Sequence, residues 1–200
     1  YCSALCACLA GFVLASCEPE EPYKRDDSVV SNPDVFILCE GLWGANNADI
    51  SAYKSDSLLC TPEYYLAQNG QYLGDTGQDI IYHKNHLYVS VYGSSYVAKM
   101  DLEGKELARY SFSAEEGQPR YLTADGDYIY VTLYSGKVAK MKASDLSVVD
   151  YAPVGMNPED IVLHKGQLLV ANSGWGADNR VTVIDVATFD SIASITVEWN

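Results

Sequence analysis

Apolar and polar residues alternate along most of the chain from about residue 32 onward. Strings such as HLYVSVYG and YIYVTLYSG place apolar side chains at every second position, the period of a strand. Gly, Asp and Asn interrupt these strings at short intervals, as turns between antiparallel strands require. A pair of helices would need apolar spacings of three and four residues, which these segments lack. The pattern predicts an all-β domain over residues 32–200.

The alternating segments recur as units of about 40 residues. Each unit holds about four short strands joined by turns, which is the signature of a propeller blade. The repeat aligns two apolar positions from unit to unit: Val89 with Val131 and Val170, and Met100 with Met141 and Ile184. The sequence therefore predicts a β-propeller of four-stranded antiparallel blades, with about four blades in this chain.

One loop sequence occurs twice, 132 positions apart. EGLWGANNADISAY contains Trp43, and NSGWGADNRVTVID contains Trp175. An apolar run precedes each copy and an alternating strand follows it. We expect the two copies to be the same inter-strand loop, between the second and third strands, on two different blades.

The first 31 residues have a different composition. Residues 1–16 carry no charge and include an apolar stretch too short to span a membrane but typical of a signal peptide. The stretch ends in Leu-Ala-Ser-Cys17, which resembles the lipobox of bacterial lipoproteins, so we expect Cys17 to be lipidated. Residues 17–31 are polar and contain proline, as expected of a flexible tether. The acidic residues after Cys17 resemble the signal that sends lipoproteins to the outer face of the outer membrane.

Removal of the signal peptide and lipidation of Cys17 would leave Cys39 and Cys60 as the remaining cysteines of the mature chain. A Cys39–Cys60 disulfide is permitted in an exported protein. Two small buried thiols fit the sequence equally well. Their spacing matches neither a zinc ribbon nor a redox CxxC motif.

The net charge of −14 bears on the choice of partners. Nucleic acids and anionic membrane surfaces attract proteins with an excess of Lys and Arg, so neither is an expected partner. We expect contact with the membrane through the lipid anchor only.

The connections between successive units carry a family resemblance. GDTGQDI, EEGQPRYL and GMNPEDIV resemble the G-x-x-P-x-[DE]-[IL] signature of YVTN-type, YncE-like propellers. VFILCEGLWGANNADISAY resembles the opening blade of a related group of surface lipoproteins, in which an apolar run and Glu-Gly precede a loop rich in Gly and Asn. The resemblance covers about residues 32–198. It implies a seven-bladed ring, of which this chain would supply about four blades and be truncated at both ends.

The same resemblance implies a function. Some members of the lipoprotein group, called BtuG, capture cobamides (vitamin B12) at the cell surface and sit on a TonB-dependent transporter. This chain is accordingly expected to bind a ligand or partner without catalysis, with a cobamide as the most specific possibility and a TonB-dependent transporter as a partner.

Candidate binding residues come from loops that a propeller gathers on one face. These are the connections between the second and third strands of each blade and those from one blade to the next. Aromatic rings combined with amides and carboxylates suit a large, planar, amide-rich ligand, such as a corrinoid or a glycan. The candidates are Glu40, Trp43, Asn46, Asn47, Tyr92, Tyr96, Arg120, Tyr134, Trp175, Asp178 and Asn179.

Each candidate also has a structural interpretation. Trp43 and Trp175 could pack between neighbouring blades, and Asn46, Asn47 and Asn179 could serve only to form turns.

Catalysis is the alternative function. A lactonase-like hydrolase or a quinoprotein-like oxidoreductase would need a metal or cofactor site, and no His or carboxylate spacing indicates one. Glu40, Asp178 and Glu159 could converge as acid and base, although their spacing does not require it. A scaffold for protein interaction is the third possibility. We expect no metal and no cofactor.

Overall fold

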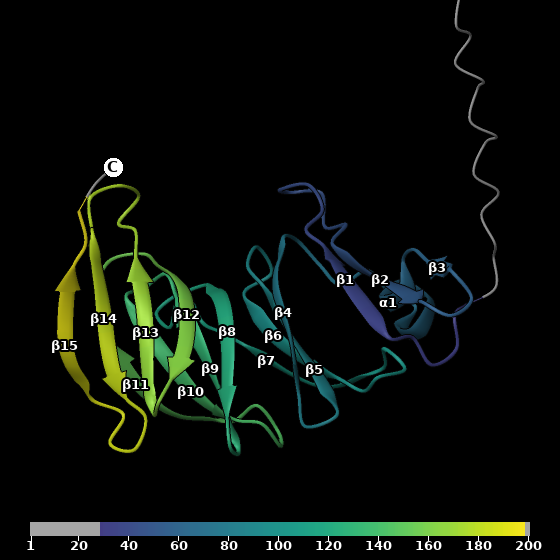
Figure 1. Ribbon diagram of the computed structural model, residues 1–200. Helices are drawn as coiled ribbons and strands as arrows, with labels where there is room; N and C mark the ends of the chain where they lie inside the picture. The colour runs from purple at the N-terminus through teal and green to yellow at the C-terminus, as the bar shows by residue number, and fades with distance from the viewer. Residues whose placement is uncertain (1–28, 199–200) are drawn as a thin grey trace, which may run out of the picture.

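The computed structural model describes residues 29–198. These residues form one three-stranded sheet and three four-stranded sheets. Figure 1 shows the sheets in chain order, from the purple first sheet to the yellow last one. The first sheet contains β1 (Val35–Cys39), β2 (Asp49–Lys54) and β3 (Leu59–Thr61), and the short helix α1 (Tyr64–Asn69) follows it.

The other three sheets are antiparallel meanders whose strands pair in chain order. The second comprises β4 (Gly77–His83), β5 (His86–Val91), β6 (Tyr96–Met100) and β7 (Glu106–Ser111). The third comprises β8 (Pro119–Asp125), β9 (Tyr128–Leu133), β10 (Lys137–Lys142) and β11 (Val148–Pro153). The fourth comprises β12 (Pro158–His164), β13 (Gln167–Asn172), β14 (Arg180–Asp185) and β15 (Ser191–Thr196).

The structure confirms the predicted repeat. Val89, Val131 and Val170 lie on the second strand of successive sheets, and all three are fully buried. The second repeated position falls on the third strand of each sheet and is equally buried; its residues are Met100, Met141 and Ile184. Residues at the same place in each unit therefore have the same surroundings.

The sheets pack face against face, with apolar clusters between successive sheets. Ala48 and Ile50 of the first sheet pack with Val89 of the second, and Tyr88 and Val97 of the second pack with Ile129 of the third. A third cluster joins the third and fourth sheets. The first strand β8 contacts both β4 and β12, the first strands of its neighbours. The first strands thus lie side by side.

The first sheet differs from the four-stranded unit that the sequence predicts. In the described residues it has three strands, and a helix that was not predicted follows β3. One oxygen of the buried Asp49 carboxylate accepts hydrogen bonds from the backbone N–H groups of Tyr65 and Leu66, at 3.0 and 3.4 Å. Tyr64 and Tyr65 are buried. Capping by Asp49 and burial of these rings favour the helix.

The folded part begins slightly before the expected boundary at residue 32. Val30 is buried, and its backbone N–H donates to Thr61 Oγ1 at 2.8 Å. The predicted signal peptide, Cys17 and the tether up to residue 28 lie outside the described residues. Between residues 29 and 198, no helix has the length and apolar character needed to cross a membrane.

The two cysteines of the domain are unpaired. Cys39 on β1 is exposed and Cys60 on β3 is partly buried. The structure therefore favours free thiols over the disulfide that the sequence left open, but the expected burial is wrong for Cys39, which is exposed.

Candidate functional site

Three polar side chains form a line across the first strands of the second, third and fourth sheets. Gln78, Arg120 and Glu159 occupy equivalent positions, with the same 42- and 39-residue spacings as the buried valines. Each lies where its strand has a β-bulge against the second strand of the sheet. Bulges turn side chains away from the regular alternation and often occur next to functional sites.

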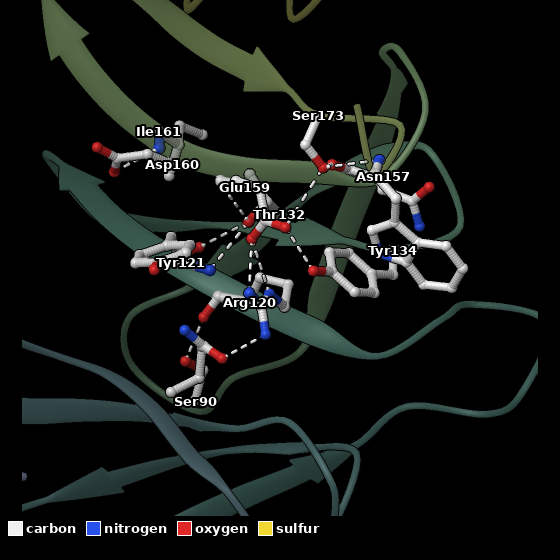
Figure 2. Close-up of polar contacts among 12 residues, drawn as sticks. Ser90, Arg120, Tyr121, Thr132, Tyr134, Asn157, Glu159, Asp160, Ile161 and Ser173 are labelled. Atoms are coloured by element: carbon white, nitrogen blue, oxygen red, sulfur yellow. Dashed lines mark hydrogen bonds and ion pairs between the residues drawn. The ribbon is translucent and has the colours of Figure 1, made fainter. Parts of the chain in front are cut away.

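Arg120 joins the other two members of this line. Its Nη1 donates to Gln78 Oε1 at 2.5 Å, while its Nε and Nη2 donate to Glu159 Oε2 at 3.0 and 2.6 Å. Figure 2 shows Arg120 between Ser90 and Glu159. The side chains of Arg120 and Glu159 are only 17% and 26% exposed, so water screens this ion pair weakly.

The second Glu159 oxygen and the Glu159 carbonyl are also held in place. Tyr134 donates its hydroxyl to Oε1, and Ser173 Oγ lies 3.4 Å from the same atom (Figure 2). Thr132 Oγ1 donates to the Glu159 carbonyl at 2.9 Å. Burial, together with the hydrogen bond to Glu159, raises the pKa of Tyr134 to about 12. Tyr134 therefore remains a neutral hydrogen-bond donor at physiological pH.

Four aromatic side chains form a row above this polar line. Trp43, Tyr92, Tyr134 and Trp175, one from each sheet, are here called the aromatic row. Successive ring centroids are 5.7, 5.3 and 6.4 Å apart. The Arg120 guanidinium carbon lies 5.0 Å from the Tyr92 ring centroid and 4.6 Å from that of Tyr134, within the range of cation–π attraction. Arg120 thus supports the middle of the row.

Tyr92, Tyr134 and Trp175 of the aromatic row line one or both of two open pockets. The larger has a volume of about 580 Å³, and Tyr92, Tyr134 and Trp175 line it together with Gln118 and Asn157. The smaller, about 340 Å³, lies between Tyr134 and Arg180. The larger pocket combines aromatic faces with amide groups, and its size lies in the range of small-molecule sites.

Comparison with known proteins identifies the architecture. No protein-family model matches the chain, and no curated protein matches it. Among solved structures, the chain is similar to the β-propeller domain of Myceliophteria thermophila Cps50 (Swd1), with a TM-score of 0.59 and 12% identity over 76% of this chain and 50% of that one. The computationally designed Ika8 protein gives a TM-score of 0.59 and 10% identity over 76% and 44%. Kuenenia stuttgartiensis hydrazine synthase gives a TM-score of 0.52 and 24% identity over 56% of this chain and 33% of that one.

The fold is a β-propeller. The described residues form a partial propeller of about four blades, and the chain spans between a third and a half of the length of these structures. At such low identity the similarity concerns the fold alone. The aromatic row and the polar line lie at one end of the propeller strands, where loops from different blades meet.

The propeller brings five of the predicted site residues together: Trp43, Tyr92, Arg120, Tyr134 and Trp175. Trp43 is 69% exposed and Trp175 is 78% exposed, and each indole also contacts a tyrosine ring of the neighbouring blade. The contact between blades that the structural interpretation expects is therefore present, while most of each indole surface remains exposed.

Two predicted residues point into the protein instead. Tyr96 is buried and donates its hydroxyl to the Leu73 carbonyl. The centroid of its ring lies 3.8 Å from the guanidinium carbon of Arg109. Asp178 is buried and pairs with Arg180 at 2.7 Å, and it also accepts a hydrogen bond from the Met156 N–H at 3.1 Å. The hydrogen bond from Arg180 lowers the pKa of Asp178 to about 2. Both side chains support the loops rather than face the pockets.

The remaining predicted residues lie in the loops around the row. Glu40, Asn46 and Asn47 are exposed. Asn46 adopts a left-handed backbone conformation, and Asn47 Oδ1 accepts the Leu42 N–H at 2.9 Å. Asn179 Nδ2 donates to the Val197 carbonyl at 2.8 Å. These contacts agree with the turn-forming role that the sequence left open for the asparagines.

The candidate binding residues did not include Gln78 and Glu159, although both lie within the inter-blade segments GDTGQDI and GMNPEDIV. The signal that could have found them is their spacing. They recur with the same interval as the buried valines, so they must lie in line with Arg120 on neighbouring blades.

Two of the three carboxylates considered for catalysis are held in separate ion pairs. Glu159 is bound by Arg120 and Asp178 by Arg180. In the part of the chain that the structure describes, no group of three or more His, Cys, Asp or Glu residues is placed to hold a metal ion.

Proposed function

We propose that this chain belongs to a cell-surface lipoprotein that binds a broad, flat ligand on its aromatic row without chemical change. The observation that carries this proposal is the row itself, four rings from four consecutive blades above a line of satisfied polar groups. The Arg120–Glu159 pair and its hydrogen bonds hold the inner rings in place. The two terminal indoles remain exposed, and exposed aromatic side chains at a concave surface are typical of binding sites.

The chemistry of the surroundings favours a ligand that combines a flat apolar face with amide or hydroxyl groups. Asn157 and Gln118 offer amide donors and acceptors beside the rings, and serine hydroxyls lie nearby. A cobamide is the most specific ligand of this kind, and its support is the resemblance of the loop sequences to the BtuG group. A glycan is the other ligand with suitable chemistry.

A calorimetric titration of cyanocobalamin into the complete protein tests this proposal. We expect micromolar or tighter binding. Trp43→Ala or Trp175→Ala should weaken it about tenfold or more, because aromatic side chains that the ligand buries contribute most of the binding free energy at such interfaces. Tyr82→Ala is the matched control, since Tyr82 is an exposed aromatic on β4 that belongs neither to the aromatic row nor to the lining of either pocket.

The outcomes separate the alternatives. Absence of heat at micromolar cyanocobalamin would remove the cobamide, and the same titration with maltoheptaose then tests the glycan. If neither binds and a pull-down recovers a protein partner through the same tryptophans, the scaffold function replaces ligand binding. A TonB-dependent transporter in that pull-down would support the proposed partnership.

The lipid anchor and the outer-membrane location are a separate part of the proposal, supported by the Leu-Ala-Ser-Cys17 sequence. Metabolic labelling with an alkyne-bearing palmitate should mark the expressed protein, and Cys17→Ser should abolish the label. Labelling that persists in Cys17→Ser would contradict lipidation at this residue.

A further inference from the structure

A second pocket lies at the opposite end of the strands from the aromatic row, between the second and third blades. Its volume is about 480 Å³. It is lined by Lys84 from the turn between β4 and β5 and by strand residues that include His86 of β5, Lys99 of β6 and Lys142 of β10. Tyr88 and Tyr128 supply aromatic walls. No part of the function proposed above uses this pocket.

The pocket concentrates positive charge in an acidic protein. Three of the chain's 13 Lys and Arg residues line it, although the net charge is −14. The one acidic residue in the lining is Asp127, which pairs with Lys84 at 2.6 Å. Both partners are well exposed, at 53% for Lys84 and 88% for Asp127, so their pairing is weak and an incoming anion can replace it. The Asp145 carboxylate interacts electrostatically with the Lys142 ammonium group.

Lys99 is the central cation of this pocket. Its side chain comes from β6, and the residue is only 8% exposed. Its Nζ donates to the Ser144 carbonyl at 3.0 Å, and within residues 29–198 no carboxylate pairs with it. An ammonium group has three N–H donors, and a buried charge is unfavourable unless it is paired. The Lys99 ammonium therefore has donors left for an anion inside the pocket.

The walls of the pocket restrict the ligand class. Tyr88 donates its hydroxyl to the Ala143 carbonyl at 2.8 Å, which fixes the ring and joins the two blades. Tyr128 lies on the third blade, on the other side of the pocket. A bare ion would leave most of this volume unused, whereas a phosphate attached to a flat organic group would meet both the lysines and the rings.

We propose that this inter-blade pocket, centred on Lys99, binds a small phosphate monoester. Lys99, Lys84 and Lys142 contact the phosphate oxygens, since lysine ammonium groups bind phosphate as point charges. Tyr88 and Tyr128 contact the organic part. The proposal does not depend on the aromatic row or on its ligand.

Calorimetric titration of the full chain at pH 7 and constant ionic strength tests this assignment, with phenyl phosphate, inorganic phosphate and benzoate as probes. We expect phenyl phosphate to bind more tightly than either of the others. Lys99→Met should weaken it by about tenfold or more, because hydrogen bonds between charged groups in a partly desolvated site are strong. Lys84→Met and Lys142→Met should each weaken it by about two- to fivefold, as expected for exposed charges.

Lys165→Met is the charge-matched control. Lys165 occupies the same turn position as Lys84 on the fourth blade, with nearly the same left-handed φ of 48° against 47°, and it does not line the pocket. Removing it changes the net charge equally, so binding within about twofold of the parent is expected. The two exposed lysines keep the test decisive if Lys99→Met does not fold.

Four results would overturn the proposal. The first is the absence of phenyl phosphate binding at ~10 mM. The second is an unchanged affinity for phenyl phosphate in all three pocket variants, and the third is a loss of affinity in Lys165→Met equal to that in the pocket variants. The last is tighter binding of benzoate than of phenyl phosphate. The last result would assign the pocket to carboxylates.

Discussion

The buried cations at the two ends of the propeller strands differ in their partners. At the end that carries the aromatic row, Arg120 meets a carboxylate, an amide and two aromatic faces. At the other end, Lys99 meets a single backbone carbonyl. Both cations are mostly buried. The difference lies in whether the fold itself supplies the counter-charge.

This contrast separates two uses of a buried charge. Arg120 is part of the construction of the aromatic row, because its partners orient the rings and the neighbouring first strands. Lys99 donates one hydrogen bond, to the Ser144 carbonyl, and its ammonium group has further N–H donors with which to bind an anion. A cation with a complete set of partners supports a site, whereas one without them is itself a candidate site.

The largest effect should follow from removing Arg120. Arg120→Met leaves Glu159 without its main partner, and we expect the free energy of unfolding to fall by about 2–3 kcal/mol, because a partly buried carboxylate is then unpaired. Urea denaturation measures this change. The double variant Arg120→Met/Glu159→Met should lose less than the sum of the single variants. A loss below about 0.5 kcal/mol in Arg120→Met would contradict the role assigned to the pair.

Lys99→Met should not lower the free energy of unfolding as Arg120→Met does. Among residues 29–198 no carboxylate pairs with this buried ammonium, so replacing it with an apolar side chain of similar length should leave the stability unchanged or raise it by up to about 1 kcal/mol. The same urea series reports it. A clear destabilisation would mean that Lys99 has a structural function, and the two ends would then be alike.

Acid should affect the end that carries the aromatic row through Asp178. Since the folded-state pKa of Asp178 is lowered to about 2, this carboxylate stabilises the fold above its ordinary pKa, near 4, and the stabilisation is lost as pH falls through 2. The effect should be less than about 1 kcal/mol because water screens the half-exposed Arg180. Denaturation series between pH 5 and 2 should show this dependence in the parent protein but not in Asp178→Asn. An identical dependence in both would contradict it.

The smallest effect on stability belongs to the exposed ends of the aromatic row. Trp175→Ala should change the unfolding free energy by less than about 0.5 kcal/mol, since the side chain is largely in solvent. Thermal denaturation followed by circular dichroism checks this. A loss above 1 kcal/mol would show that the indole supports the fold, and its effect on ligand binding could then not be attributed to direct contact.

The period of the sequence was sufficient to predict the architecture. Val89, Val131 and Val170 were aligned from spacing alone and proved to be equivalent and buried. Helix α1 was not predicted, because it depends on a contact between Asp49 and backbone groups sixteen and seventeen residues later. Such a contact is set by tertiary packing rather than by local preference.

The candidate site was only partly predictable. Loop membership selected Trp43, Tyr92 and Trp175, which the structure brings into one row, but it does not say which way a side chain points. Tyr96 illustrates the limit: it begins β6 and shares a face with Ala98 and Met100, so strict alternation already indicated burial. The unpaired state of Lys99 could not be read from the sequence, because it depends on which groups the neighbouring blade brings nearby.

The meander order of the sheets has a consequence for how the molecule meets other chains. In each of the four sheets of the described residues, the first and the last strand pair with one neighbour only, so each sheet has two free edges. Such an edge is a template onto which an extended peptide can add by main-chain pairing. β3 spans three residues, whereas β7, β11 and β15 span six each, so an added strand should pair less extensively with the first sheet than with the others.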